Sequence, residues 1–146
     1  MNAKHYVSLE AAKKLKELGY NESTEFVHVD NEPIFNGISI NYLKPELCNG
    51  YKVEDNTCYP CPTLLEAMDW LESKDIHMEV RMRHMKIKGD PYKVADTDEY
   101  QWQYYYAICK GDDVEHPIIG CDESYVVIMY TDRNECMQKA IEKALE

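Results

Sequence analysis

The stretch CPTLLEAMDWLESKDIHMEVRM, residues 61–82, changes from a helical to a strand-like pattern near its middle. Thr63 and Glu66 have the spacing of a capping box, in which each side chain accepts a hydrogen bond from the other residue's backbone N–H. Apolar residues then recur at helical spacing, which predicts an amphipathic helix to about Lys74. From Ile76 onward apolar and polar residues alternate, which is typical of a half-buried strand. The stretch therefore predicts a capped helix that leads directly into a strand.

The alternation slips further along this strand. Met85 and Ile87 fall on the opposite parity, which predicts a bulge near Arg83 and His84. Residues 100–109 alternate in turn and form a second strand. We expect most of its aromatic face to lie in the core, namely Tyr100, Trp102, Tyr104 and Tyr106.

The run SYVVIMY, residues 124–130, is apolar at nearly every position. This composition predicts a central strand covered on both faces. Ser8 and Asp132 have the positions of N-caps for a first and a last helix, and Gly19 is placed to end the first. The last helix has a stripe of residues that we expect to be buried, made of Cys136, Met137, Ala140, Ile141, Ala144 and Leu145.

Turn residues divide the region between the first two helices. Residues 25–40 contain two short strand-like runs, which predict a small hairpin. Residues 41–61 carry Pro45, Asn49-Gly50 and Asp55-Asn56, which predict a long loop. The expected element order is α-ββ-α-βββ-α. We therefore expect an α+β fold, a mostly antiparallel sheet packed by helices, as a single two-layer domain over residues 1–146.

The composition limits the classes of partner. The chain has 27 acidic against 16 basic residues and a formal net charge of −11. Because nucleic-acid binding depends on lysine and arginine, direct contact with nucleic acid is not expected over most of the surface. An acidic surface suits a cationic partner, and net charge also simply favours solubility. We find neither a signal peptide nor a membrane span, so a cytoplasmic protein is expected.

The spacing of three cysteines raises the question of a metal or redox site. Cys58 and Cys61 form a CxxC pair that a zinc ion would bind with Cys48 as third ligand. A redox pair is the second interpretation. Because the second CxxC or CxxH pair of a typical zinc site is missing, and both cysteines precede the helix cap, we favour a structural loop.

Positive charge is concentrated in the strand that starts at Ile76. His77, Arg81 and Arg83 share its polar face, where same-face neighbours lie about 7 Å apart. This row, with Tyr105 as an exposed contact, would hold an anion such as a nucleotide phosphate. Cross-strand pairing with the protein's own Asp and Glu is the favoured alternative, and Glu79 in the same row supports it.

Four segments are similar to a family of small proteins encoded by phages and prophages of gut bacteria. They are YVSLEAAKKLKELGY (6–20), CPTLLEAMDWLES (61–73), DIHMEV (75–80) and TDRNECMQKAIEKALE (131–146). The resemblance covers both ends and the centre of the chain but not residues 25–57 and 88–124, and Cys61 stands where Ala or Ser is usual. It implies a setting, a mobile genetic element inside a bacterial cytoplasm, and no mechanism.

The sequence contains no recognisable catalytic motif. Its five histidines are scattered, and no glycine-rich phosphate loop is present. We therefore expect a non-enzymatic phage or prophage protein that acts by macromolecular interaction, as an acidic inhibitor of a basic protein in one version. A binder of nucleotides or other anions is the alternative. The sequence leaves the oligomeric state open and is compatible with a homo-oligomer.

Overall fold

The computed structural model describes residues 3–22, 24–29, 38–39, 52–53, 56–88 and 99–146. Its helices are a short 3-10 turn η1 (Ala3–His5) and the α-helices α1 (Leu9–Glu17), α3 (Leu64–Ser73) and α4 (Arg133–Ala144). The strands are β1 (Phe26–Val29), β2 (Ile38–Ser39), β3 (Lys52–Val53), β4 (Asn56–Cys61), β5 (Ile76–Lys88), β6 (Glu99–Lys110) and β7 (Ile118–Ile119). The α+β class is confirmed, and the expected element order roughly matches.

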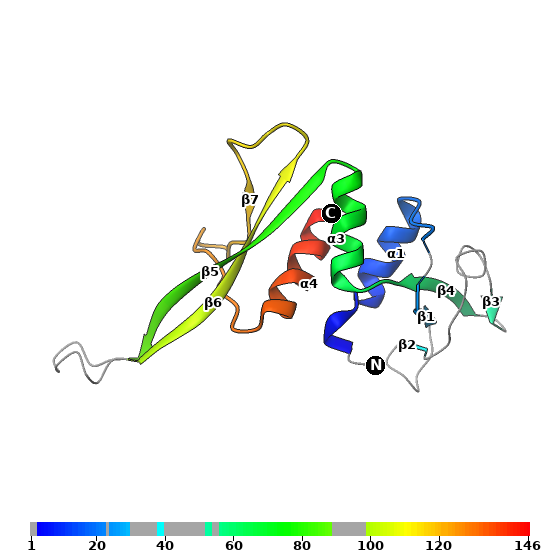
Figure 1. Cartoon of the computed structure of the whole chain (residues 1–146), viewed down its shortest axis with the longest axis horizontal. Helices are drawn as coiled ribbons and strands as arrows, with labels where there is room; N and C mark the ends of the chain where they lie inside the picture. The colour runs from blue at the N-terminus through cyan, green and yellow to red at the C-terminus, as the bar shows by residue number, and fades with distance from the viewer. Residues whose placement is uncertain (1–2, 23, 30–37, 40–51, 54–55, 89–98) are drawn as a thin grey trace.

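The strands form two sheets, and every described pairing is antiparallel. One sheet has the order β2-β1-β4-β3 and the other β5-β6-β7. The three α-helices lie between them: α1 packs on β4, while α3 and α4 pack on β5 and α4 also on β6 (Figure 1). One buried cluster joins the helices to β6, and its largest fully buried members are Tyr20, Leu15, Leu71, Ile108, Ile141 and Val7.

Local signals place the helices correctly. The Ser8 Oγ accepts a hydrogen bond from the Ala11 N–H at 3.2 Å, and Thr63 and Glu66 form both bonds of a capping box. The Asp132 carboxylate accepts bonds from the first backbone N–H groups of α4. Gly19 has a φ of +96°, as expected of a left-handed helix end. The predicted stripe of α4 is buried in full.

The hairpin between the first two helices is confirmed, and the loop after it is partly wrong. β1 pairs with β2 through Val27 with Ser39 and His28 with Ile38; the turn lies outside the described residues. Residues 56–61, which we expected in a loop, form β4 and pair with β1. Turn residues earlier in this region suggested a loop, but residues 58–61 pair with β1, and all of them except half-buried Tyr59 are buried. Most of residues 41–55 lies outside the described part.

β5 and β6 form a long two-stranded ribbon. Their register runs from Ile76 with Lys110 to Lys86 with Tyr100 without a break, and shifts only between Lys86 and Lys88. The bulge predicted near Arg83 and His84 is therefore wrong. Both of these residues are exposed, so the core does not impose an apolar alternation there.

The prediction for residues 124–130 is also wrong. Tyr125 is 90% exposed and Val126 59%. Tyr130 forms an isolated bridge with Tyr104 of β6, and Val127 forms one with Cys121, which lies after β7. The Asp122 carboxylate accepts hydrogen bonds from the N–H groups of Ser124 and Val126, and Tyr125 adopts a left-handed φ of 62°. This turn prevents a straight strand. β7 instead pairs beside β6.

Candidate interaction surface on the β5–β6 ribbon

The four residues predicted to bind an anion occupy one face of the ribbon. His77, Arg81 and Arg83 share a face of β5, and Tyr105 pairs with Arg81 across the strands. The guanidinium groups of Arg81 and Arg83 lie 6.0 Å and 5.3 Å from the centre of the Tyr105 ring. The structure therefore brings Arg81, Arg83 and Tyr105 together.

Carboxylates of the protein itself engage two of these residues. The His77 Nε2 lies 3.0 Å from Asp75, and the Arg81 guanidinium lies 3.0 Å from Glu79. Hydrogen bonds to Glu79 and then Tyr105 raise the pKa of Arg81 above its ordinary value. Pairing with the protein's own carboxylates is thus present for both residues, but each partner lies two positions earlier in the chain and not on the facing strand as we expected. Exposed Arg83 forms no ion pair with a carboxylate among the described residues.

The opposite face of the ribbon carries an exposed stack of aromatic rings. The His84 ring stacks on Trp102 with centres 4.9 Å apart and an interplanar angle of 25°. The Tyr100 ring lies 5.2 Å away from His84 and is tilted by 38°. We call His84, Tyr100, Trp102 and their neighbour Met82 the aromatic face.

The expectation that most of this aromatic stripe lies in the core is wrong for its outer members. Tyr106 is buried and Tyr104 packs against the core, but Trp102 is 57% and Tyr100 54% exposed. The ribbon continues beyond α3 and α4, so the helices cover only its inner half (Figure 1). The alternation of residues in the sequence showed that these rings share one face of the strand. It gave no information about where the helices that cover this face end.

The two strands of the ribbon also carry a local positive charge. They contain five lysines and arginines against two glutamates, in a chain whose net charge is −11. We call residues 81–88 and 99–105 the outer ribbon. At about 3.3 Å per residue, it extends on the order of 20 Å along the strands. Its aromatic face lies opposite a face that carries Arg81 and Arg83, of which Arg81 is paired with Glu79.

Cys58 and Cys61 lie in β4 and are fully buried. Their separation of three residues places them on opposite faces of the strand. Burial raises the pKa of both thiols, that of Cys61 to about 12, whereas a redox thiol needs a lowered pKa. No group of three potential metal ligands occurs among the described residues, and Cys48 lies outside them.

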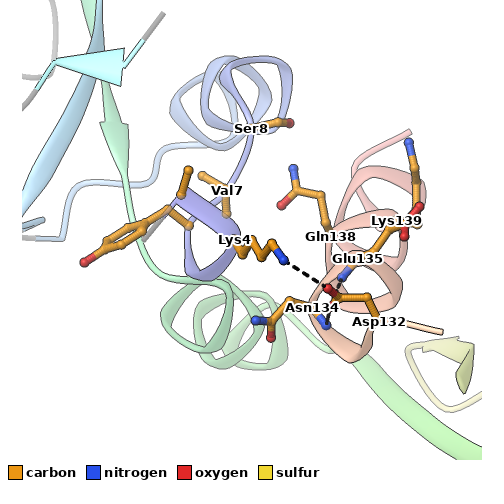
Figure 2. A pocket seen from close by; sticks show the side chains of 10 residues that line it. Lys4, Val7, Ser8, Asp132, Asn134, Glu135, Gln138 and Lys139 are labelled. Carbon is orange, nitrogen blue, oxygen red and sulfur yellow. Dashed lines mark hydrogen bonds and ion pairs between the residues drawn. The ribbon is translucent and has the colours of Figure 1, made fainter. Parts of the chain in front are cut away.

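A cavity of about 610 Å³ lies between η1 and the start of α4 (Figure 2). The Lys4 ammonium lies 3.8 Å from the Asp132 carboxylate across it. The Gln138 amide nitrogen donates to Glu142, while its buried oxygen has no hydrogen-bond partner within the part of the chain that the structure describes. Two lysines and two carboxylates line the cavity, namely Lys4, Lys139, Asp132 and Glu135, so it favours neither sign of ligand charge. Sequence reasoning did not identify it.

An acidic hollow of about 480 Å³ adjoins α3. The carboxylates of Glu22, Glu66 and Asp69 line it together with Tyr20 and Trp70. Burial raises the pKa of Tyr20, and the charges of Glu66 and Glu22 raise it further. The hollow therefore has a negative potential beside an aromatic wall.

Comparisons with known proteins assign no function to these surfaces. No family model matches the sequence, and neither the curated proteins nor the solved structures include a similar chain. Among the described residues, no helix has both the length and the apolar character needed to cross a membrane.

Proposed function

We propose that this is a non-enzymatic accessory protein of a phage or prophage, acting in the bacterial cytoplasm by binding another macromolecule through the outer ribbon. The observation that carries the proposal is the exposure of the aromatic face. Met82, Tyr100 and Trp102 are each more than half exposed, on the outer part of the ribbon, beyond the described helices (Figure 1). Aromatic residues and arginine are enriched where proteins bind one another, because they bury a large area for few rotatable bonds.

The ring stack supports binding because it is already ordered. His84 contacts both Trp102 and Tyr100, so the three rings hold one another in place. When a partner covers these rings, apolar surface is buried, and the rings lose little side-chain entropy because they are already held in place. Arg83, which no described carboxylate neutralises, adds a cationic contact on the other face.

Crosslinking in bacterial lysate tests this proposal. Tagged full-length protein is compared with Trp102→Ser and with Leu65→Ser, a control that removes a 62% exposed side chain from α3. We expect a partner that is captured by the unmodified protein and by Leu65→Ser, and lost with Trp102→Ser. Equal capture by all three proteins would contradict the proposal. Circular dichroism establishes that each variant is folded.

The acidic hollow beside α3 supports a second candidate, the inhibitor of a basic protein. Glu22, Glu66 and Asp69 converge there, and the Trp70 ring already has the Lys74 ammonium 5.2 Å from its centre. A lysine or arginine of a partner would find similar surroundings. In the same crosslinking experiment, this function predicts that capture is lost with Glu22→Gln/Asp69→Asn and retained with Trp102→Ser.

A further inference from the structure

We infer that two copies of this chain associate through β5, whose outer edges pair antiparallel and join the two ribbons into one continuous sheet. This inference goes beyond the proposed function, because it concerns the edge of the ribbon and not its aromatic face. β5 is the outermost strand in the order β5-β6-β7, and within the described residues no strand pairs with its outer edge. Such an edge presents backbone N–H and C=O groups to which a further strand can bind.

Two hydrogen-bond patterns identify the residues of β5 whose backbone groups point outward. Tyr104 of β6 exchanges both backbone hydrogen bonds with Tyr130, on the side away from β5. Met82, which faces Tyr104, therefore directs its own N–H and C=O to the outer edge. The Gly111 N–H donates to the Asp75 carbonyl oxygen, which agrees with bonding of the odd-numbered positions to β6. The even-numbered residues of β5 thus point outward.

The outer edge of β5 is long and regular. Its register with β6 is unbroken from Ile76 to Lys86, and the strand contains no proline. The helices cover only the inner part of the ribbon, and Met82, Arg83 and His84 are exposed (Figure 1). Natural proteins commonly protect an edge strand with a bulge or a proline. The stretch of β5 from Ile76 to Lys86 has neither.

The charges of β5 select one register. Charged residues usually discourage edge pairing, because like charges then face each other across the strands. When Val80 lies on the two-fold axis, Glu79 of each copy faces Arg81 of the other. A shift of two residues in either direction places Arg81 opposite Arg81 or Glu79 opposite Glu79. In the register centred on Val80, Arg83 also lies diagonal to Glu79 of the other copy, within reach of a long side chain.

The same register satisfies the outward backbone groups. It pairs Val80 with Val80, Met78 with Met82 and Ile76 with His84, so outward residues meet outward residues and form on the order of ten hydrogen bonds. The charged residues then occupy non-hydrogen-bonded positions, where facing Cα atoms are only about 4.5 Å apart. The inner half of one ribbon lies beside the outer half of the other, so the helices of the two copies cover different parts of the joined sheet.

Sedimentation velocity of the purified full-length chain measures the association. We expect a species of twice the mass of the chain that dissociates on dilution. Met82→Pro removes an outward N–H without removing a hydrogen bond to β6. It should weaken the dimer at least roughly tenfold, because each dimer loses two backbone hydrogen bonds. Met82→Ala removes most of the same exposed side chain, keeps the N–H, and should dimerise like the unmodified chain.

Charge variants test the register. Glu79→Arg sets arginine against Arg81, and Arg81→Glu sets glutamate against Glu79. Each variant should therefore self-associate at least roughly tenfold more weakly than the unmodified chain. Arg133→Glu makes the same change of charge as Arg81→Glu on the exposed surface of α4 and should have no effect. Circular dichroism establishes that each variant is folded.

Mixing the two variants is the decisive step. Glu79→Arg and Arg81→Glu together should form a heterodimer about as stable as the original dimer, because every arginine at these positions then faces a glutamate. Both variants lack the 3.0 Å contact between Glu79 and Arg81 within one chain. Recovery on mixing therefore reports pairing between copies and not repair of that internal contact.

Three results would overturn the inference. The first is an unmodified chain that sediments as a monomer at every concentration up to its solubility limit. The second is a dimer that withstands Met82→Pro, which would place the contact on another surface. The third is a pair of charge variants that remain monomeric when mixed. None of these results bears on the proposed function, whose test is the Trp102-dependent capture of a different protein.

Discussion

The Nε2 atom of His28 lies 2.7 Å from the backbone carbonyl oxygen of Val7, and both residues are almost fully buried. The Val7 N–H in turn donates to the Pro62 carbonyl oxygen at 3.1 Å. The backbone of Val7, just before α1, is thus bonded to β1 and to the residue that precedes the cap of α3. Three segments distant in sequence meet at this residue.

Replacing His28 with leucine should lower the free energy of unfolding by about 1–3 kcal/mol, because the Val7 carbonyl is left buried without this donor. Urea unfolding provides the measurement. His116 makes a comparable 3.0 Å contact with Asp113 on the surface, so His116→Leu is the control and should change stability by less than about 0.5 kcal/mol. A similar decrease in the free energy of unfolding for both variants would show that the buried hydrogen bond to Val7 stabilises the fold no more than the surface contact of His116.

Replacing Thr63 with alanine should lower the free energy of unfolding by about 1 kcal/mol, because the Glu66 N–H loses its acceptor at the start of α3. Thr63→Ser keeps the hydroxyl and should retain most of the stability. Thermal unfolding of the two variants compares them directly. If serine is as destabilising as alanine, packing of the threonine methyl group and not capping is responsible.

Stability should decrease at alkaline pH, and two buried thiols contribute to the decrease. Burial raises the pKa of Cys61 and Cys136 to about 12, against about 8.5 in an unfolded chain. The folded state therefore holds these protons more tightly. The resulting stability is fully present below about pH 8.5 and is lost as the pH rises toward 12, by at most about 1.4 kcal/mol per pH unit for each thiol.

Urea unfolding between pH 7 and 10.5 measures this dependence. Cys136→Ala should flatten the alkaline decrease, whereas Cys121→Ala, at an exposed position, should leave its slope unchanged. The comparison depends on slopes, so a constant loss of stability from the missing Cys136 side chain does not affect it. An unchanged slope for Cys136→Ala would contradict the raised pKa.

Replacing Tyr125 with glycine should raise the free energy of unfolding by about 0.5–1 kcal/mol. Tyr125 adopts a φ of 62°, which is strained for residues with a Cβ atom and relaxed for glycine, and its exposed ring loses few contacts. Thermal unfolding at neutral pH is the measurement. Tyr125→Ala keeps the Cβ atom and should give no gain; equal effects of glycine and alanine would mean that the backbone is not strained.

The parts of the fold that sequence predicted are those with local causes. The capping interactions of Ser8, Thr63 and Asp132 depend on residues within three positions, and the buried stripe of α4 follows from helical periodicity. The prediction of a central strand at residues 124–130 was wrong, because the apolar character of a segment does not reveal which segment pairs beside β6. The Asp122 turn was the local signal against a central strand.

The sequence predicted which residues share the faces of the candidate site, but it did not predict which of their side chains are exposed. Alternation placed Arg81, Arg83 and Tyr105 together on one face, as observed. It also placed Trp102 on the face that packs under the helices near Tyr106. Whether a residue on that face is covered depends on the length of the helices relative to the ribbon, which is a relationship between distant segments.

The partial cover of the ribbon has an evolutionary consequence. Met82, Tyr100 and Trp102 lie outside the buried cluster, so substitutions among them have little effect on the core that holds the helices together. Selection is then able to change what the ribbon recognises while the fold remains stable. We expect related chains to differ most at these exposed positions and least at Leu15, Leu71 and Ile141. Substitutions at the exposed positions change the contact surface, whereas substitutions at the three buried positions destabilise the core.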